Sequence, residues 1–288
     1  MLTIKAPAKI NWFLEVKGKR PDGYHEIETV MQSVSLFDEI TVSDADTLDL
    51  TCNIELGDTK QNLVYRAAEI LQREHAPSRG AHIVLKKQIP HGAGLGGGSS
   101  DAANALVALN RLWGLGLGHD RLRELVAQVG SDCAFFIEGG TALCTGRGEI
   151  VTPLRDLAGL DLVILYPNDV CPTPAVYREL SQDLTFDTVS CYLFHKLPAQ
   201  PRAEEIASLI KNRLQEPALR VSARLRAVWD RTAQMDGKLV QFVSGSGSSV
   251  VFLLADQRSA DHLSESLRAM QLGQVFAVKT LPRGAVWG

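Results

Sequence analysis

One glycine-rich stretch constrains most strongly what this chain can fold into. Residues 89–101 read Ile-Pro-His-Gly-Ala-Gly-Leu-Gly-Gly-Gly-Ser-Ser-Asp, with five glycines from Gly92 to Gly98. Because glycine has no Cβ, the backbone N–H groups of such a loop can approach a bulky anion. Residues 82–85 before the loop read as a strand, and a helical apolar pattern follows it: Ala102, Leu106, Leu109 and Trp113. This order predicts a phosphate site, since unpaired N–H groups and the positive end of the helix dipole meet there.

Two other glycine motifs fit this loop less well. A P-loop requires a lysine after its last glycine, and this chain has Ser99 there. Gly92, Gly94 and Gly97 match the spacing of the dinucleotide-binding fingerprint, and Asp120 lies roughly 20 residues on. That fingerprint belongs to the opening βαβ unit of a parallel sheet, however, whereas a long stretch of mostly β pattern precedes this loop.

A flexible linker is the remaining alternative for the glycine-rich stretch. Linkers seldom lie between a clear strand and a capped amphipathic helix. Here Ser99, Ser100 and Asp101 are all residue types that cap helices, so we expect the helix to begin near them.

Composition narrows the class of protein. The chain has 288 residues, a 45% hydrophobic and 22% charged composition and a net charge of −3. These values are typical of a soluble globular protein with one large or two ordinary domains, without strong attraction to nucleic acid or anionic membranes. We find neither a transmembrane-length apolar run nor the apolar core of a signal peptide. Five cysteines without a Cys-x-x-Cys pair argue against a disulfide scaffold or a zinc site, so we expect a cytoplasmic protein.

Residues 90–100 resemble the Pro-x-x-x-Gly-Leu-Gly-Ser/Gly-Ser-Ser loop of the GHMP small-molecule kinases, named for galactose, homoserine, mevalonate and phosphomevalonate. Residues 7–11 (Pro-Ala-Lys-Ile-Asn) and 20–25 (Arg-Pro-Asp-Gly-Tyr-His) resemble one branch of that family. This branch phosphorylates the C2 hydroxyl of 4-diphosphocytidyl-2-C-methyl-D-erythritol in the non-mevalonate isoprenoid pathway. The resemblance runs from Lys5 to about Val251.

The resemblance implies an α+β, two-domain GHMP kinase fold. Residues 1–158 would form an N-terminal, ribosomal-S5-domain-2-like domain that binds ATP. Residues 159–288 would form a C-terminal split βαββαβ (ferredoxin-like) domain that binds the acceptor. We expect a monomer or weak homodimer that binds the diphosphocytidyl methylerythritol and ATP, with no nucleic-acid or membrane partner.

The resemblance also implies ATP and Mg²⁺ as cofactors, with the triphosphate on the glycine loop. The expected nucleotide-binding residues are Pro90, His91, Gly92, Ala93, Gly94, Leu95, Gly96, Gly97, Gly98, Ser99, Ser100 and Asn62, the last also the expected cap of a helix over residues 62–74. Mg²⁺ would bridge phosphate oxygens through waters, and its protein ligands stay unassigned because the sequence offers no obvious carboxylate cluster.

Residues 10–16 alternate, with apolar residues on one face of a strand and Lys9, Asn11, Phe13 and Glu15 on the other. From the residues alone, the pattern predicts that Lys9 and Asn11 are two solvated polar side chains on a strand. The resemblance implies instead that Lys9 is an active-site lysine and that Asn11 binds substrate.

Tyr24 and His25 follow a polar turn, and such a pair is usually structural. A ring beside an imidazole also suits a planar base, and the resemblance implies that both recognise cytosine. Met31 stands where close family members carry an aromatic ring.

Asp132 follows a helix that Gly130 ends. From the residues alone, a role as the cap of a further short turn explains it equally well. Its surroundings resemble the family's Gly-Ala-Asp-Val-Pro-Phe-Phe, with Ser131 and Ala134 as departures, in which the aspartate is the general base. Phosphoryl transfer needs such a base, and Lys9 can offset charge near the γ-phosphate.

The second half of the chain predicts a strand at 161–166, a helix at 219–235, strands at 239–243 and 249–254, a helix at 259–272 and a strand at 274–280. This order is typical of a split βαββαβ unit. The segment 171–177 is a proline-rich loop before a helix, and the loop 244–249 is explained locally by a β-hairpin turn. The resemblance adds substrate-binding residues in both: Thr173, Tyr177, Gly245, Ser246 and Gly247. Residues 181–200 read as a variable insertion.

Three alternatives to this function stay open. They are another GHMP kinase with a different alcohol acceptor, a non-catalytic nucleotide-binding module, and an NAD-binding protein.

Overall fold

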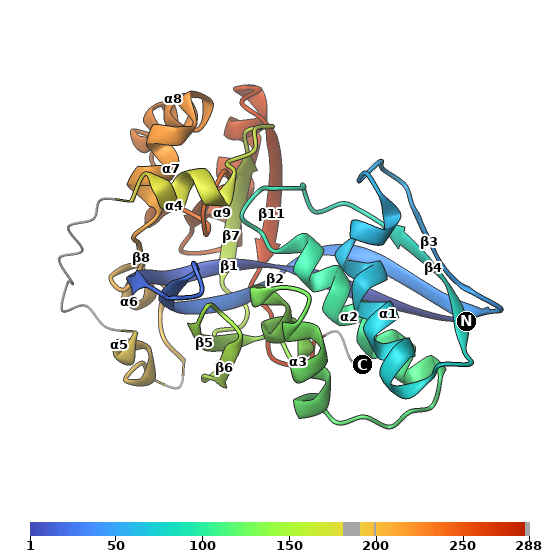
Figure 1. Cartoon of the computed structure of the whole chain (residues 1–288). Coiled ribbons are helices and arrows are strands. Elements are labelled where there is room, and N and C mark those ends of the chain that lie inside the picture. The colour runs from blue at the N-terminus through green and yellow to red at the C-terminus, as the bar shows by residue number, and fades with distance from the viewer. Residues whose placement is uncertain (181–190, 199, 286–288) are drawn as a thin grey trace.

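The computed structural model describes residues 1–180, 191–198 and 200–285. Its largest element is a long antiparallel ribbon of β1 (Leu2–Lys19) and β2 (His25–Ala45), which runs across the whole molecule in Figure 1. Many of their residues are fully buried, because layers cover the ribbon on both faces.

The first sheet has seven strands in the described part of the chain. Its order is β3-β4-β2-β1-β8, and the β5–β6 hairpin pairs with β2. The remaining strands are β3 (Leu48–Cys52), β4 (Gly80–Lys86), β5 (Thr141–Gly146), β6 (Ile150–Pro153) and β8 (Lys211–Asn212).

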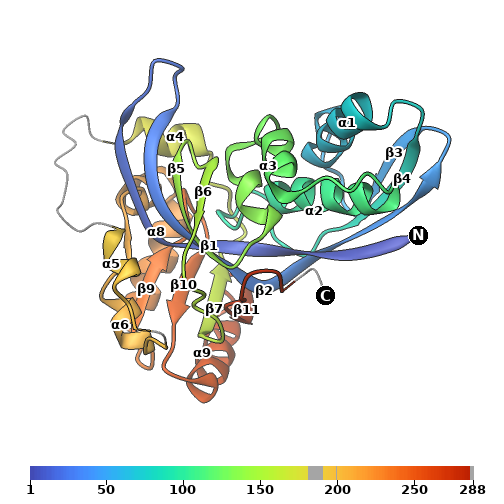
Figure 2. The same ribbon diagram turned by 90° about the horizontal axis from the view of Figure 1, so that it is seen from below.

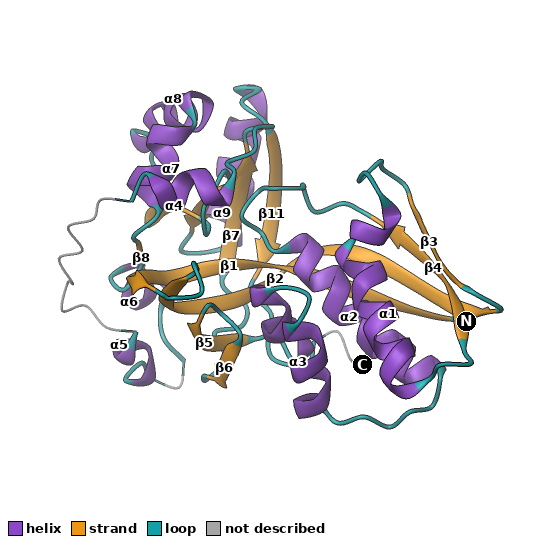
Figure 3. Ribbon diagram, viewed as in Figure 1, coloured by secondary structure: helices purple, strands orange, loops and turns teal. Residues whose placement is uncertain are grey.

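Three helices cover one face of this sheet: α1 (Leu63–His75), α2 (Gly97–Leu112) and α3 (His119–Ala127). The short 3₁₀ helices η1 (Thr59–Gln61) and η2 (Ser131–Ile137) lie beside them. Figure 3 shows these helices in purple against the orange strands. Their apolar faces and the sheet form one hydrophobic core, in which Leu71, Leu106 and Phe135 are fully buried.

The second sheet has the predicted split βαββαβ arrangement. Its order β11-β7-β10-β9 is antiparallel throughout, with strands β7 (Asp161–Tyr166), β9 (Val240–Val243), β10 (Val250–Leu253) and β11 (Gln274–Lys279). Its helices are α4 (Thr173–Arg178), α5 (Tyr192–His195), α6 (Ala203–Ala207), α7 (Gln215–Val221), α8 (Ala223–Ala233) and α9 (Gln257–Ala269). The single helix predicted over 219–235 is two helices, because Ser222 is extended and caps α8 through its side chain.

The two sheets pack against each other across the β1–β2 ribbon. Ile10 and Trp12 from β1 share a core with Ile164 of β7 and Val251 of β10. In Figure 2 the helices α1–α3 lie on one side of this ribbon and the second sheet on the other. The boundary predicted between residues 158 and 159 stays a prediction, and a continuous apolar core extends across it.

Two local predictions differ from the structure for identifiable reasons. The register of β1 shifts between Asn11 and Phe13, so Phe13 is buried in the core with Trp12 instead of sharing the face of Lys9. Helix α2 begins earlier than expected, with Gly96 in the left-handed conformation as its N-cap, so residues 99–101 lie inside the helix. The predicted cap Asn62 is confirmed, since its side chain accepts the N–H of Val64.

The insertion predicted at 181–200 falls partly on residues 181–190 and 199, which lie outside the described residues. The five cysteines are free thiols, as the sequence predicts. Among the described helices, none has the length and apolar character needed to cross a membrane.

Candidate active site

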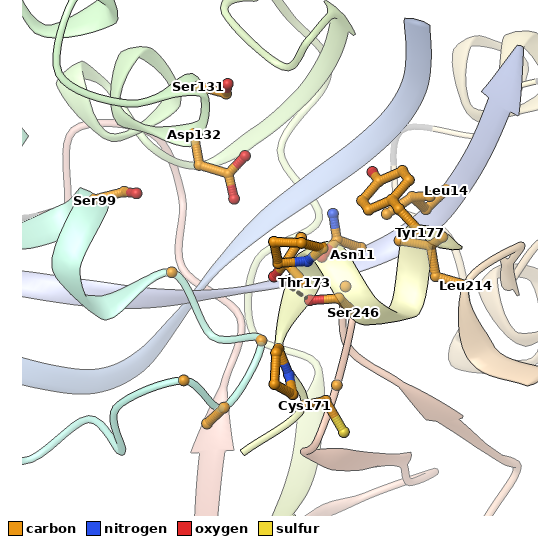
Figure 4. A pocket seen from close by; sticks show the side chains of 18 of the residues that line it. Asn11, Leu14, Ser99, Ser131, Asp132, Cys171, Thr173, Tyr177, Leu214 and Ser246 are labelled. Carbon is orange, nitrogen blue, oxygen red and sulfur yellow. Dashed lines mark hydrogen bonds between the residues drawn. The ribbon is translucent and has the colours of Figure 1, made fainter. Parts of the chain in front are cut away.

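A cleft of about 1370 Å³ opens where the two sheets meet. The first glycine loop and η2 line one wall, and the segment before α4 and the β9–β10 loop line the other. The two walls meet where the β9–β10 loop is hydrogen-bonded to the first glycine loop. Figure 4 shows Ser99, Ser131 and Asp132 on the first wall and Thr173, Tyr177 and Ser246 across from them. The cleft therefore brings together residues that are far apart in the sequence.

The glycine loop presents free amides at the start of α2. Gly96 has a φ of 69°, and a Cβ there would lie 2.9 Å from Lys9 Cγ and from Phe136 Cζ. The N–H of Ser100 donates to the Gly96 carbonyl at 2.9 Å, which begins the helical hydrogen-bond ladder. The amides of Gly97, Gly98 and Ser99 precede that ladder, so they remain available to an anion.

The second glycine loop, residues 244–249, is fastened to the first. Ser244 Oγ donates to the Gly94 carbonyl at 3.0 Å, and the N–H of Ser249 donates to the Ala93 carbonyl at 3.1 Å. Gly94 has a φ of 77°, and a Cβ on it would lie only 2.2 Å from the Ser244 carbonyl oxygen. A side chain at Gly94 would therefore push the two loops apart.

Lys9 and Asn11 lie side by side on the floor of the cleft, as the alternation in β1 predicts. Lys9 Nζ donates to Asn11 Oδ1 at 2.7 Å, and Asn11 Nδ2 donates to Thr29 Oγ1 at 2.8 Å. The backbone N–H of Lys9 donates to the Leu95 carbonyl at 2.9 Å, which fixes this strand to the glycine loop. Only 4% of Lys9 is exposed, so its ammonium group has a defined position.

Asp132 faces Lys9 from the first turn of η2. Its Oδ2 lies 3.5 Å from Lys9 Nζ, and 30% of its side chain is exposed to the cleft. The backbone of Gly148, at the tip of the β5–β6 hairpin, passes beside the carboxylate: a Cβ on this residue would lie 3.3 Å from Asp132 Oδ1. A carboxylate in this position can accept a proton from an alcohol bound in the cleft.

An aromatic corner, formed by Tyr24, His25 and Tyr177, closes one end of the cleft. The rings of His25 and Tyr177 are stacked, with centroids 4.6 Å apart and planes 26° apart. Burial and the charge of Lys19 lower the pKa of His25, which favours a neutral imidazole. Burial, with a contribution from Asp132, raises the pKa of Tyr177. Such a corner suits a planar, uncharged base.

Beside this corner, the hydroxyl oxygens of Thr173 and Ser246 lie 2.8 Å apart, which links α4 to the second glycine loop (Figure 4).

A buried ionic cluster supports the glycine loop from below. Lys87 Nζ contacts Asp38 Oδ2 and lies 2.6 Å from Asp101 Oδ2, and Asp38 Oδ1 accepts the N–H of Ile89 at 2.8 Å. Burial alone would lower the pKa of Lys87, but the two carboxylates raise it above its ordinary value. Burial, with the nearby Asp38 charge, raises the pKa of Asp101 to about 8. Lys87 also lines the cleft, beside Gly97.

Most of the predicted site residues line the cleft. These are Lys9, Asn11, Tyr24, His25, Pro90, His91, Gly92, Ala93, Gly94, Gly96, Gly97, Gly98, Ser99, Asp132, Thr173, Tyr177, Gly245, Ser246 and Gly247. Three others do not: Leu95 is buried in the core, Ser100 is buried beside Asn104, and Asn62 caps α1. Met31, which departs from the family pattern, is buried and lines the cleft.

Sequence reasoning did not assign Lys87 or Arg147 to this cleft. A lysine three residues before the loop's proline was the available signal for Lys87, but its partners Asp38 and Asp101 come from other elements. For Arg147, the available signal was the Gly-Arg-Gly-Glu sequence at 146–149, which is typical of a hairpin turn. The contact of Arg147 with Tyr24, however, depends on how β5 pairs with β2.

Comparison with known proteins identifies the family of this chain. Residues 62–140 match the family model described as the GHMP kinases N terminal domain. The 4-diphosphocytidyl-2-C-methyl-D-erythritol kinase of Desulfitobacterium hafniense is 35% identical over 98% of this chain and 97% of its own. The same enzyme of Pelotomaculum thermopropionicum is 39% identical over 93% of this chain and 94% of its own. The chain belongs to the 4-diphosphocytidyl-2-C-methyl-D-erythritol kinase family.

Solved structures place this kinase family within a wider fold. A crystal structure of 4-(cytidine 5'-diphospho)-2C-methyl-D-erythritol kinase superposes with a TM-score of 0.80 at 34% identity, covering 97% of this chain and 99% of the other. The homoserine kinase of Cytophaga hutchinsonii superposes with a TM-score of 0.75 at 17% identity, covering 98% and 95%. That second likeness establishes only the fold. The predicted GHMP kinase fold is thereby confirmed.

Proposed function

We propose that this chain transfers the γ-phosphoryl group of ATP to the C2 hydroxyl of 4-diphosphocytidyl-2-C-methyl-D-erythritol, a step of the non-mevalonate route to isoprenoid precursors. The observation that carries the proposal is the pairing of Lys9 with Asp132 at 3.5 Å, in the same cleft as the free amides of the glycine loop. The names of relatives that match nearly the whole chain support the choice of acceptor.

The glycine loop would hold the triphosphate of ATP. The amides of Gly97, Gly98 and Ser99 are available donors, and the N-terminal end of α2 adds its positive dipole. Lys9 would offset the charge that develops on the transferred group, because its ammonium is fixed by Asn11 and faces the cleft.

The acceptor would span the remaining part of the cleft. Its cytosine suits the aromatic corner, where neutral His25 can pair with polar edges of the base. Its C2 hydroxyl would then approach Asp132, which would accept the proton late in the transfer. Thr173 and Ser246 offer hydroxyls for the polar groups between these two ends.

Mg²⁺ would enter with ATP as part of the substrate. Among the described residues, no group of three His, Cys, Asp or Glu side chains could hold a metal ion. The ion would be bound mainly by phosphate oxygens and waters. The hydroxyl of Ser99, which lines the cleft, can add one protein oxygen. Bound there, Mg²⁺ would neutralise phosphate charge during the transfer.

ADP release, measured in a coupled assay with different acceptors, tests this function. We expect release that depends on 4-diphosphocytidyl-2-C-methyl-D-erythritol and that homoserine or mevalonate does not support. Release with one of those alcohols instead would identify another GHMP kinase. No release with any acceptor, although ATP raises the melting temperature, would indicate a nucleotide-binding module without chemistry.

A further inference from the structure

The tip of the β5–β6 hairpin touches both ends of the proposed acceptor site. The guanidinium carbon of Arg147 lies 4.7 Å from the centroid of the Tyr24 ring, which belongs to the aromatic corner. The next residue, Gly148, lies beside the Asp132 carboxylate: a Cβ on Gly148 would be 3.3 Å from Asp132 Oδ1. The hairpin tip therefore extends from the position of the base, where it carries the Arg147 guanidinium, to the position of the reacting hydroxyl.

The acceptor has its own diphosphate in this interval. In the proposed substrate, two phosphates join the cytidine to the methylerythritol, so they must lie between the base and the C2 hydroxyl. Their negative charges need a partner distinct from the glycine loop, which the ATP phosphates would occupy. A guanidinium suits this task, because its planar fork can form two parallel hydrogen bonds to phosphate oxygens.

The surroundings of Arg147 hold its side chain in place without burying it. Its backbone N–H donates to Glu149 Oε2 at 2.6 Å, and its Nε lies 3.7 Å from Glu149 Oε1. The guanidinium lies over the Tyr24 ring, and 28% of the side chain is exposed in the cleft. Arg20, at the same end of the molecule, is less available to a ligand. Its guanidinium pairs with two carboxylates, those of Asp22 and Glu26, whereas Arg147 lies 3.7 Å from the carboxylate of Glu149.

We propose that Arg147 is a specificity-determining residue that binds the diphosphate of the acceptor. This inference rests on the proposed function and deepens it, since it identifies what distinguishes a diphosphocytidyl alcohol from a simple alcohol. Tyr24 and His25 then recognise the base, and Arg147 recognises the linkage that follows it.

Calorimetric binding of CDP and of cytidine to the full chain tests the proposal, because the two ligands differ by the diphosphate. We expect Arg147→Ala to weaken CDP binding roughly tenfold or more and to change cytidine binding less than about twofold, the scale of a lost charge-assisted contact. Arg147→Lys keeps the charge without the fork, so we expect an intermediate loss. Circular dichroism and melting temperature check that each variant is folded.

Arg178→Ala is the matched control, because Arg178 also lines the cleft but from α4. We expect a smaller loss of CDP affinity in this variant than in Arg147→Ala. Equal losses in the two variants would show only a general effect of positive charge and overturn the proposal. Equal losses for CDP and cytidine in Arg147→Ala would also overturn it, since Arg147 would then act through the Tyr24 ring.

Turnover separates this inference from the proposed function. With wild-type protein, an absence of acceptor-dependent ADP release would refute the proposed function itself. With an active wild type, we expect Arg147→Ala to raise KM for the acceptor while KM for ATP stays near its wild-type value. An unchanged acceptor KM in that variant would overturn only the role of Arg147.

Discussion

Lys9 Nζ lies 3.5 Å from Asp132 Oδ2, although the two residues belong to elements, β1 and η2, that are far apart in the sequence. The lysine is held by Asn11 and by the backbone bond of its own N–H to Leu95. The aspartate is more exposed and faces the cleft. The pair therefore combines a fixed cation with an accessible base, as phosphoryl transfer to an alcohol requires.

Replacement of Lys9 tests whether the two side chains act together. We expect Lys9→Met to lower kcat about 10²-fold or more, because a fixed positive charge near the transferred group is lost. In a double-mutant cycle with Asp132→Asn, the two losses should combine with a coupling of roughly 0.5–3 kcal/mol, since the side chains are in contact. Fully additive losses would contradict a joint role.

The sequence predicted the parts of this site that follow from local rules. Strand alternation was enough to place Lys9 and Asn11 on one face, and the glycine spacing was enough to predict the phosphate loop. The alternation failed after Asn11, because a register shift inserts one residue and the pattern of single residues does not reveal it.

Other parts of the site depend on contacts between distant segments. The cluster of Lys87, Asp38 and Asp101 joins residues from around β4, from β2 and from α2, and none of these is distinctive in its own segment. The start of α2 was predicted wrongly for a different reason. Residues 99–101 are good caps, but a left-handed glycine at 96 begins the helix one turn earlier.

Gly94 tests the attachment of the two glycine loops. We expect Gly94→Ala to lower stability by about 1–3 kcal/mol, because the residue has positive φ and a Cβ would meet the Ser244 carbonyl. Gly98→Ala is the matched control: the nearest contact of its Cβ would be a tolerable 3.6 Å to Leu63. Thermal unfolding of both variants measures the difference. Equal melting temperatures would show that the two loops are not packed as described.

His25 gives the acceptor site a predictable pH dependence. Burial and the charge of Lys19 lower the pKa of His25 below its ordinary value, so the imidazole becomes charged only at a lower pH than a free histidine does. We expect cytidine affinity to be independent of pH near neutrality and to fall as the pH drops through this lowered pKa. In His25→Gln this dependence should disappear. Identical pH curves for the two proteins would exclude His25 from base recognition.

Asp101 gives the fold its own pH dependence. Its pKa rises from 3.8 unfolded to about 8 folded, so the folded state binds a proton that the unfolded state releases. This stabilising contribution is complete at low pH and is lost as pH rises through that interval. We expect the unfolding free energy of Asp101→Asn to fall less steeply than that of wild type between pH 6 and about 8, by up to roughly 1.4 kcal/mol per pH unit. Denaturant titrations at several pH values measure this, and parallel curves would contradict it.

The most direct test of the account is kcat of Asp132→Asn in acceptor-dependent ADP release, measured together with its affinity for ATP. Asparagine keeps the shape of the side chain and cannot take the proton. The account predicts a kcat lower by roughly 10² or more and an ATP affinity within about twofold of wild type. A variant that turns over as fast as wild type would show that Asp132 is not the base and that the chemistry lies elsewhere in the cleft.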